Sequence, residues 1–185
     1  MNTFRGFIAI DIKCSSSLLG FINDLKKAPA QLKMVEPENI HLTLKFLGDT
    51  KEKIIPDIEE VMKQSTEDIP PFEVNLQGVG VFPNKNYITV IWVGMEKKQE
   101  LTFIAEKLDE LLQNLGYKKE RRPFSPHVTV ARVKRIKEKN TLLSLLEKYR
   151  ETDFGKLKVD SIKLKKSDLT PKGPIYTTIR EINLG

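Results

Sequence analysis

The sequence predicts a fold of mixed helices and strands, built from two similar units that face each other across a cleft. Stretches with the apolar spacing of strands alternate with stretches of helical spacing. This alternation runs twice along the chain, and a His–apolar–Thr–apolar tetrapeptide lies at the same place in each run, at residues 41–44 and 127–130. With 185 residues, the chain is long enough to bury a core, and residues 1–185 are expected to form one domain of two duplicated lobes.

The first unit begins with a strand, FRGFIAID, that is apolar enough to be buried. Ser15 offers a cap for the helix that follows it, and Pro70-Pro71 ends the second helix of the unit. The expected elements are a strand at 4–11, a helix at 15–27, a strand at 40–47, a helix at 51–64 and a strand at 72–81.

The second unit repeats this order. A turn at residues 83–86 joins the units as a hairpin, and Gly116 closes a long amphipathic helix. The expected elements are a strand at 87–93, a helix at 96–115, a strand at 127–133, a helix at 140–149 and a strand at 157–164. A last strand, at 175–182, is left over and is expected to complete a sheet.

The composition is typical of a soluble globular protein, with 39% hydrophobic and 30% charged residues. No apolar stretch reaches the length of a membrane span, and the first residues lack the pattern of a signal peptide. One cysteine, Cys14, excludes an internal disulfide and a thiolate zinc site, and it suits a reducing cytoplasm. The net charge of +6 is a weak sign of a polyanionic partner.

Both histidines of the chain lie in the repeated tetrapeptide, as His41 with Thr43 and as His127 with Thr129. A double match of this kind has a chance probability of about one in ten thousand. Because residues i and i+2 of a strand share a face, each histidine projects together with its threonine. A pseudo-twofold between the units would bring both pairs into one cleft.

Two imidazoles and two hydroxyls suit the cleavage of a phosphodiester. One imidazole takes a proton from the attacking oxygen and the other gives a proton to the leaving oxygen, since histidine titrates near neutrality. The hydroxyls can donate hydrogen bonds to the non-bridging oxygens. Two histidines without an acidic cluster make a poor transition-metal site, so no metal and no other cofactor is expected.

The paired tetrapeptides resemble those of the 2H phosphoesterases. The closer similarity is to the RNA 2',3'-cyclic phosphodiesterases of archaea and bacteria, also called 2'-5' RNA ligases, and it covers FRGFIAIDI, PENIHLTLKFLGD, GVGVFPN, PHVTVARVK and GPIYT. The resemblance implies an α+β fold with two pseudo-twofold-related lobes, whose antiparallel sheets line a central cleft and whose helices lie outside. It also implies metal-independent hydrolysis of a 2',3'-cyclic phosphate to a 2'-phosphomonoester.

The resemblance also implies roles for single residues. His41 would be the proton donor to the leaving 3' oxygen and His127 the proton acceptor from water, and the roles would exchange in ligation. Arg132 would contact the phosphate. In a regular strand, however, Arg132 would face away from His127, so a bulge or the strand end must turn it round.

Two aromatic residues need a separate interpretation. Phe46 lies as many residues after His41 as Arg132 lies after His127. Packing in the core is the favoured interpretation for Phe46, and binding of substrate by stacking on an RNA base is the alternative. Trp92, like Cys14, is expected in or near the core without a role.

Four functions remain open. The first is hydrolysis of a 2',3'-cyclic phosphate at an RNA end, tRNA-derived ends included; the second is ligation of RNA ends by the same groups. The third is RNA binding by a degenerate site, against which the intact histidines and threonines argue. The fourth is action on a small nucleotide such as ADP-ribose cyclic phosphate, whereas the positive charge favours RNA. A cytoplasmic monomer is expected, without a membrane or an obligatory protein partner.

Overall fold

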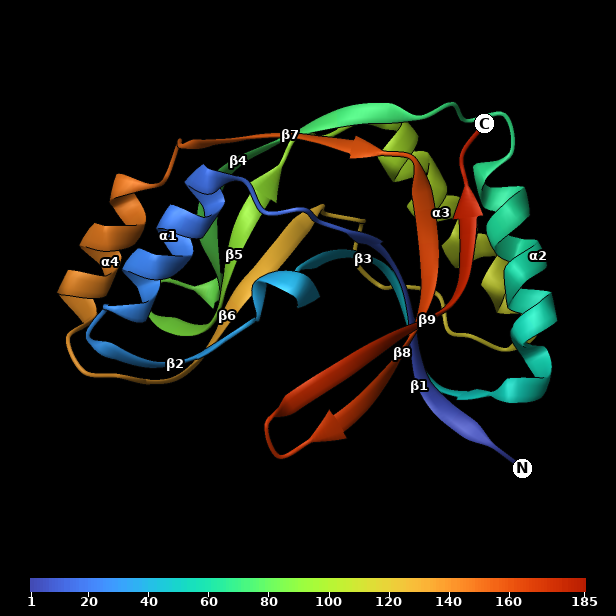
Figure 1. The fold of residues 1–185 in the computed structure, drawn as a ribbon, viewed down its shortest axis with the longest axis horizontal. Helices are drawn as coiled ribbons and strands as arrows, with labels where there is room; N and C mark the ends of the chain where they lie inside the picture. The colour runs from blue at the N-terminus through green and yellow to red at the C-terminus, as the bar shows by residue number, and fades with distance from the viewer.

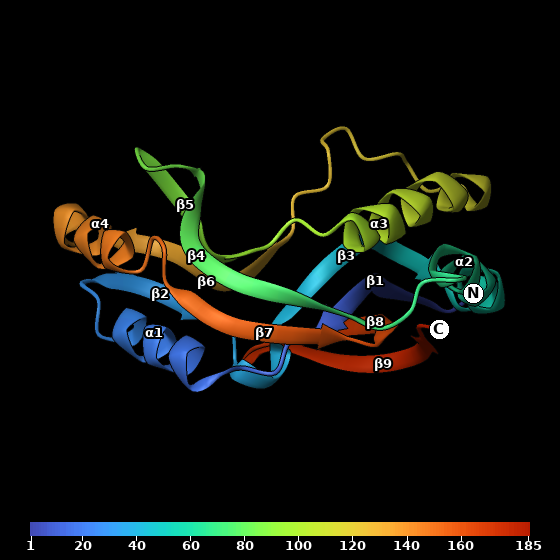
Figure 2. The same ribbon diagram turned by 90° about the horizontal axis from the view of Figure 1, so that it is seen from above.

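The computed structural model describes residues 1–185 and arranges nine strands and four α-helices in two lobes (Figure 1). Each lobe contains one antiparallel sheet, and the helices lie outside the sheets, so the α+β class implied by the resemblance is confirmed. Seen from above, α1 and α4 lie at one end of the molecule and α2 and α3 at the other (Figure 2).

The first lobe holds a four-stranded sheet in the order β3-β1-β8-β9. Helices α2 and α3 pack against each other, and they also contact β9 and β3 respectively. The elements of this lobe are β1 (Thr3–Asp11), β3 (His41–Lys51), β8 (Ser161–Thr170), β9 (Gly173–Asn183), α2 (Ile55–Thr66) and α3 (Gln99–Leu112).

The second lobe holds a five-stranded sheet in the order β2-β6-β5-β4-β7. Its elements are β2 (Ala30–Met34), β6 (His127–Ile136), β5 (Tyr87–Met95), β4 (Phe72–Asn84), β7 (Asp153–Val159), α1 (Ser16–Lys26) and α4 (Lys139–Lys148). The predicted cap of α1 is confirmed, because the Ser15 hydroxyl accepts a hydrogen bond from the Leu18 amide at 3.1 Å.

The lobes do not coincide with the two units that the sequence suggests. Strand β4, the last of the first unit, lies in the second sheet. Helix α1 follows β1 of the first lobe but packs on β7 of the second lobe, whereas α3 follows β5 of the second lobe but packs on β3 of the first. The chain therefore passes between the lobes repeatedly (Figure 1).

The single strand predicted at 157–164 is wrong. Strand β7 ends at Val159 and β8 begins at Ser161, and the two strands belong to different sheets. The buried residues reveal the break, since the step from Val159 to Ile162 is three residues and not two. Strand β2 escaped prediction because its residues are only half-buried or exposed, which leaves little apolar pattern.

The buried apolar side chains of both sheets form one continuous cluster of 37 residues, so the two lobes share one core. In β3, Leu42 and Leu44 point into this cluster, and Val128 and Val130 do so in β6. The apolar positions of both motifs thus anchor the strands that carry the histidines. None of the helices is long and apolar enough to cross a membrane.

We predict opposite stability effects for two glycine substitutions. Gly20 lies inside α1, and an added methyl group would meet no atom within 4 Å. Gly20→Ala should therefore raise the free energy of unfolding by about 0.5–1 kcal/mol. Gly78 has φ of +72°, and its Cβ would lie 2.5 Å from the Arg150 carbonyl oxygen. Gly78→Ala should lower the free energy of unfolding by about 1–3 kcal/mol. Urea unfolding of both variants checks this, and equal effects would contradict it.

Candidate active site

The two motif histidines occupy equivalent positions, each as the first residue of its strand. The Nδ1 atom of His41 lies 2.7 Å from the carbonyl oxygen of Asn39, and Nδ1 of His127 lies 2.8 Å from that of Ser125. A carbonyl oxygen only accepts, so Nδ1 donates in both rings. The Nε2 atom of each ring is therefore left to exchange a proton with a ligand.

Strand β3 has a bulge opposite β1 three residues after its histidine. Thr43 pairs with Ala9 and Lys45 pairs with Ile8, which leaves Leu44 unpaired between them. Such a bulge reverses the alternation of faces along the strand. The result is that Leu44 and Lys45 both point away from the face that carries Thr43.

Strand β6 contains the same irregularity at the same distance from its histidine. Thr129 pairs with Trp92 and Ala131 pairs with Ile91, which leaves Val130 unpaired. Because the bulge reverses the alternation, Arg132 joins the face of His127 and Thr129. The bulge that phosphate contact by Arg132 requires is thus present.

Phe46 is not a core residue. It pairs with Phe7 beyond the bulge of β3, just as His41 pairs with Asp11 at the start of the strand. Paired residues of antiparallel strands share a face, so Phe46 lies on the same face as His41 and Thr43. Its side chain is 67% exposed, so the expectation of core packing is wrong: the bulge turns Phe46 outward and Lys45 inward.

Each imidazole is flanked by two aromatic rings. His41 lies 5.0 Å from the Phe7 ring centroid and 5.3 Å from that of Tyr176. His127 lies 5.0 Å from Phe82 and 6.2 Å from Trp92. These rings hold the imidazoles in place through edge and tilted contacts.

Sequence reasoning missed these four aromatic rings because they come from other strands of the two sheets, whose order and register the sequence does not reveal. Trp92, expected to have no role, lies on the same face as Thr129. Its ring lies over Gly80, where a Cβ would come within 2.2 Å of it. The GVGVFPN segment was the available signal for this contact, because it contains both Gly80 and Phe82.

The hydroxyls of Thr43 and Thr129 make no hydrogen bond within the protein, although both residues are half-buried. A threonine on a strand can satisfy its hydroxyl with a nearby carbonyl, as Thr89 of β5 does by donating to the Phe82 carbonyl oxygen at 3.1 Å. Both motif hydroxyls are therefore available to donate to a bound group. No cluster of three or more His, Cys, Asp and Glu side chains is placed to hold a metal ion.

The His41 imidazole is largely buried and has charges of both signs nearby. Burial lowers the pKa of the His41 imidazole below its usual value, and the positive charge of Lys165 lowers it further. The hydrogen bond to Asn39 and the charge of Asp11 act in the opposite direction. Asp11 itself pairs with Lys165 and, at 2.8 Å, with Lys163.

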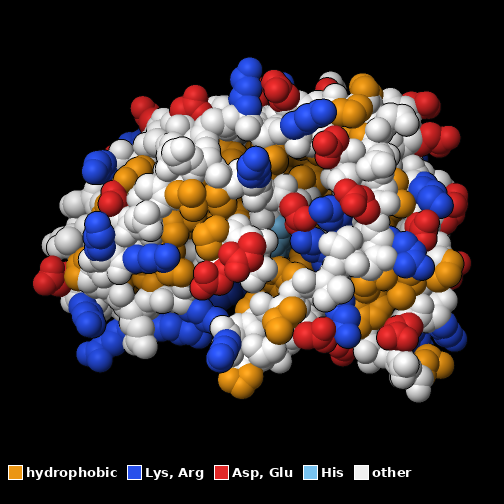
Figure 3. Space-filling view, in the orientation of Figure 1, with side chains coloured by type: hydrophobic (Ala, Val, Ile, Leu, Met, Phe, Trp, Pro, Cys, Tyr) orange, Lys and Arg blue, Asp and Glu red, His pale blue; other side chains and the backbone are white.

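Residues of both lobes meet at Tyr176. Burial raises the pKa of the Tyr176 phenol, while the positive charges of Arg132 from the second lobe and Arg5 from the first lobe act against this rise. Strands β3 and β6 are also in contact. Figure 3 shows a histidine side chain, in pale blue, set back in a hollow near the middle of the molecule.

The chain is similar to known proteins over its whole length. A family model described as the 2'-5' RNA ligase superfamily matches residues 15–170. The chain belongs to this superfamily. An RNA 2',3'-cyclic phosphodiesterase of Methanothermobacter thermautotrophicus is 38% identical over 182 residues, covering 97% of this chain and 98% of the relative. One of Methanocaldococcus jannaschii is 42% identical over 179 residues, covering 96% and 99%.

Solved structures of this superfamily fold agree with the architecture. A crystal structure from Thermus thermophilus matches with a TM-score of 0.78 at 27% identity, covering 97% of each chain. Escherichia coli LigT in complex with 3'-AMP matches with the same TM-score of 0.78 at 23% identity, covering 99% of each chain. The resemblance inferred from the paired tetrapeptides is confirmed at the level of family and fold.

We predict that the pKa of His41 responds to its charged neighbours. Lys165→Met should raise this pKa because it removes a positive charge, and Asp11→Asn should lower it because it removes a negative one. Titration of the two imidazole Cε1 protons by NMR measures both shifts, with His127→Gln assigning the signals. Lys166→Met is the matched control, since Lys166 lies on the opposite face of β8. A His41 pKa that Lys165→Met leaves in place would contradict the prediction.

Proposed function

We propose that this protein is an RNA 2',3'-cyclic phosphodiesterase, which opens the cyclic phosphate at an RNA end to a 2'-phosphomonoester. The observation that carries the proposal is the matched pair of imidazoles, each fixed through Nδ1 and each beside a threonine hydroxyl without a partner. The curated relatives named RNA 2',3'-cyclic phosphodiesterase support the choice of substrate, since they are similar along nearly the whole chain.

In the proposed reaction the cyclic phosphate lies between the two imidazoles. Nε2 of His127 takes a proton from water, whose oxygen bonds to phosphorus while the bond from phosphorus to O3' breaks. Nε2 of His41 gives its proton to O3'. The product carries a 2'-phosphate and a 3'-hydroxyl, and solvent returns both histidines to their starting states.

The low pKa of His41 fits the role of proton donor. In the free protein, burial disfavours the charged imidazolium. A bound phosphate anion counteracts this effect and brings a proton onto His41. Because its surroundings hold that proton weakly, His41 transfers it readily when negative charge develops on O3'.

Three further side chains are proposed to stabilise the phosphate. The hydroxyls of Thr43 and Thr129 donate to its non-bridging oxygens, where negative charge increases in the transition state. Arg132 provides a guanidinium on the face of His127 and can bind two phosphate oxygens at once. These groups take no part in proton transfer.

Ligation of RNA ends by a 2'-5' bond is the second candidate. In ligation the 5'-hydroxyl of a second RNA takes the place of water: its oxygen bonds to phosphorus while the bond to O3' breaks, with His127 again as base and His41 again as acid. The exchange of roles expected from the sequence applies only to the reverse reaction, the cleavage of a 2'-5' bond. The chain belongs to the 2'-5' RNA ligase superfamily, which favours ligation as the second candidate.

A monomer is proposed as the working unit, because one chain carries both motif histidines. Ends of cleaved tRNA in a reducing cytoplasm, which the free thiol of Cys14 suits, are a proposed source of substrate.

Incubation with an RNA oligomer that ends in a 2',3'-cyclic phosphate tests the function. We expect the oligomer to gain one water by mass spectrometry, and phosphorus NMR to place the phosphate on the 2' oxygen. A 3'-phosphate product would contradict the proposed direction of opening.

We predict that His41→Ala and His127→Ala each reduce turnover by about 10²–10⁴-fold, the usual effect of losing a positioned acid or base. In a substrate with an activated aryl leaving group, that group departs without a proton. Such a substrate should therefore rescue His41→Ala far more than His127→Ala. Circular dichroism must first show that both variants are folded.

Equal rescue of the two histidine variants would mean that the assignment of acid and base is wrong. Full activity in both variants would remove the two-histidine mechanism altogether.

We predict a smaller effect for the hydroxyls, because they bind charge and do not transfer protons. Thr43→Ala and Thr129→Ala should each remove at most about 2–4 kcal/mol of transition-state stabilisation, seen as a loss of kcat. Thr43→Ser and Thr129→Ser keep the hydroxyl and should retain most of the activity. If the alanine variants match the parent enzyme, the hydroxyls have only a structural role.

A further inference from the structure

A basic groove runs along β3, the edge strand of the first sheet. It lies between β3 and residues 115–120, which follow α3, and it encloses about 570 Å³. The side chains that matter to its chemistry are one exposed aromatic, one half-buried aromatic and four exposed lysines: Phe46, Tyr117, Lys51, Lys53, Lys118 and Lys119.

The lysines of the groove are not neutralised by the protein. None of the four takes part in an ion pair, whereas the buried Lys45 pairs with Asp109 and Glu120. Two acidic residues, Asp49 and Glu120, also line the groove. The Glu120 carboxylate is already bound by Lys45 at 3.1 Å. The groove therefore carries a net positive charge that an anionic ligand can meet.

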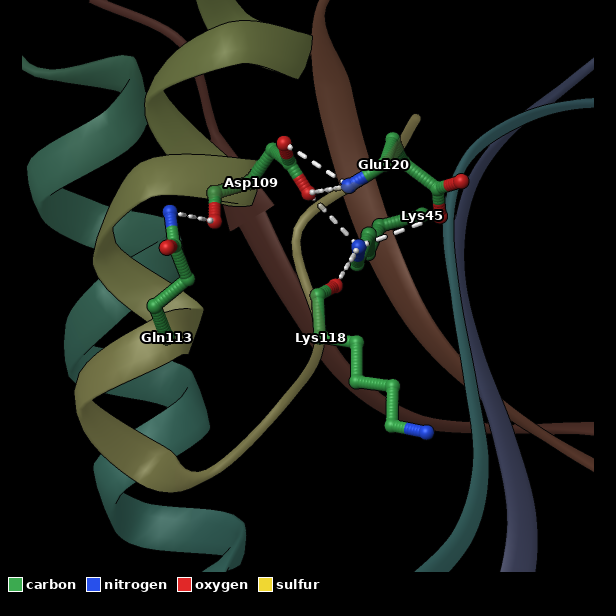
Figure 4. A network of polar contacts seen from close by, with 5 residues as sticks. All are labelled: Lys45, Asp109, Gln113, Lys118 and Glu120. Atoms are coloured by element: carbon green, nitrogen blue, oxygen red, sulfur yellow. Dashed lines mark hydrogen bonds and ion pairs between the residues drawn. The ribbon is translucent and has the colours of Figure 1, made fainter. Parts of the chain in front are cut away.

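The wall that carries Lys118 and Lys119 is held by a buried cation (Figure 4). The Nζ atom of Lys45 donates to Asp109 Oδ1 at 2.6 Å, to the Lys118 carbonyl oxygen at 2.8 Å and to Glu120 Oε1 at 3.1 Å. The Lys45 side chain is only 2% exposed. It reaches α3 because the bulge at Leu44 turns it to the helix side of the sheet.

This clamp fixes the backbone of the wall and leaves its side chains free. The Glu120 amide adds hydrogen bonds of 3.1 and 3.2 Å to the Asp109 carboxylate. Figure 4 shows the Lys118 side chain extending away from the cluster while its carbonyl faces Lys45. The groove is thus a fixed feature of the fold.

Phe46 connects the groove to the histidines. It lines the groove and also lies on the face of β3 that carries His41 and Thr43. Along the strand, Phe46 is roughly 15 Å from His41, given the rise per residue of a strand. An exposed ring beside a positive groove is the combination that binds single-stranded nucleic acid, because bases stack on the ring and phosphates meet the cations.

We propose that this groove binds the RNA chain that precedes the cyclic phosphate, with a base stacked on Phe46 and the phosphates near Lys118 and Lys119. The inference rests on the proposed function, because it places the terminal phosphate of the RNA between the two histidines. It implies that the enzyme prefers an oligonucleotide over a mononucleotide, which is too short to reach the groove.

The first test removes two of the groove's charges. The variant Lys118→Ser with Lys119→Ser is compared with Lys26→Ser with Lys27→Ser, two exposed lysines at the end of α1 on the other lobe. Both pairs change the net charge equally. The probe is a fluorescent single-stranded RNA ending in a 2'-phosphate, and its binding is followed by anisotropy over a series of salt concentrations.

We expect the groove variant to bind the RNA several-fold more weakly. The plot of log K against log salt should become shallower by about 1.4, because each phosphate contact on a single strand contributes about 0.7 to the slope. The control variant should keep the parent slope. The ratio of kcat/KM for an oligonucleotide to that for a mononucleotide 2',3'-cyclic phosphate should also fall in the groove variant alone.

The second test concerns stacking. An RNA with 2-aminopurine near its 3' end should lose fluorescence on binding to the parent protein and to Phe46→Tyr, which keeps a ring, but not on binding to Phe46→Leu. Quenching that persists in Phe46→Leu would overturn the role of Phe46 as a stacking platform.

The outcomes separate the two proposals. If the parent hydrolyses cyclic phosphates but the groove and control variants share one salt slope, the groove is wrong and the function stands. If the parent hydrolyses neither substrate but binds RNA with a slope that depends on Lys118 and Lys119, the function is wrong and the groove stands.

Discussion

In an antiparallel sheet, paired side chains share a face, and one unpaired residue reverses the faces of everything beyond it. Leu44 and Val130 are such residues, each placed three positions after a motif histidine. Without them, Arg132 would lie behind its sheet and Lys45 would project into the site in place of Phe46. The two bulges therefore decide which side chains can contact a phosphate. The bulge at Leu44 also turns Lys45 into the interior, where it supports the groove wall.

The sequence predicts the motif part of the site well because the period of a strand is short and local: His41 with Thr43 and His127 with Thr129 follow from spacing alone. It predicts the surroundings poorly, because Phe7, Tyr176, Phe82 and Trp92 reach the imidazoles through strand pairing between distant segments. The strand boundaries were predictable to within a few residues in most cases. The assignment of strands to lobes was not, since β4 and β8 cross to the other lobe without any local signal beyond the broken alternation near Asp160.

The two halves of the site differ although their motifs match. The His41 ring is packed among Phe7, Tyr176 and the Asp11 and Lys165 pair, and burial disfavours its charged form. His127 meets Phe82 and Trp92, with Arg132 on the same face. Two matching motifs therefore place their histidines in unequal surroundings. The bound substrate then sets which imidazole acts as acid and which as base, because each lies against a different oxygen of the phosphate.

Because the lobes are interleaved, the two sheets are completed at different times during synthesis on the ribosome. The inner strand β1 needs β8 as its second neighbour, and Ala9 pairs with Lys163 near the far end of the chain. The first sheet therefore remains incomplete until almost the whole polypeptide has been synthesised, while its apolar residues wait unpaired. Most of the second sheet emerges earlier and can form a scaffold. Truncation at the carboxyl end should for this reason disrupt the amino-terminal lobe, and fusion partners are better placed beyond Gly185 than inserted between β7 and β8.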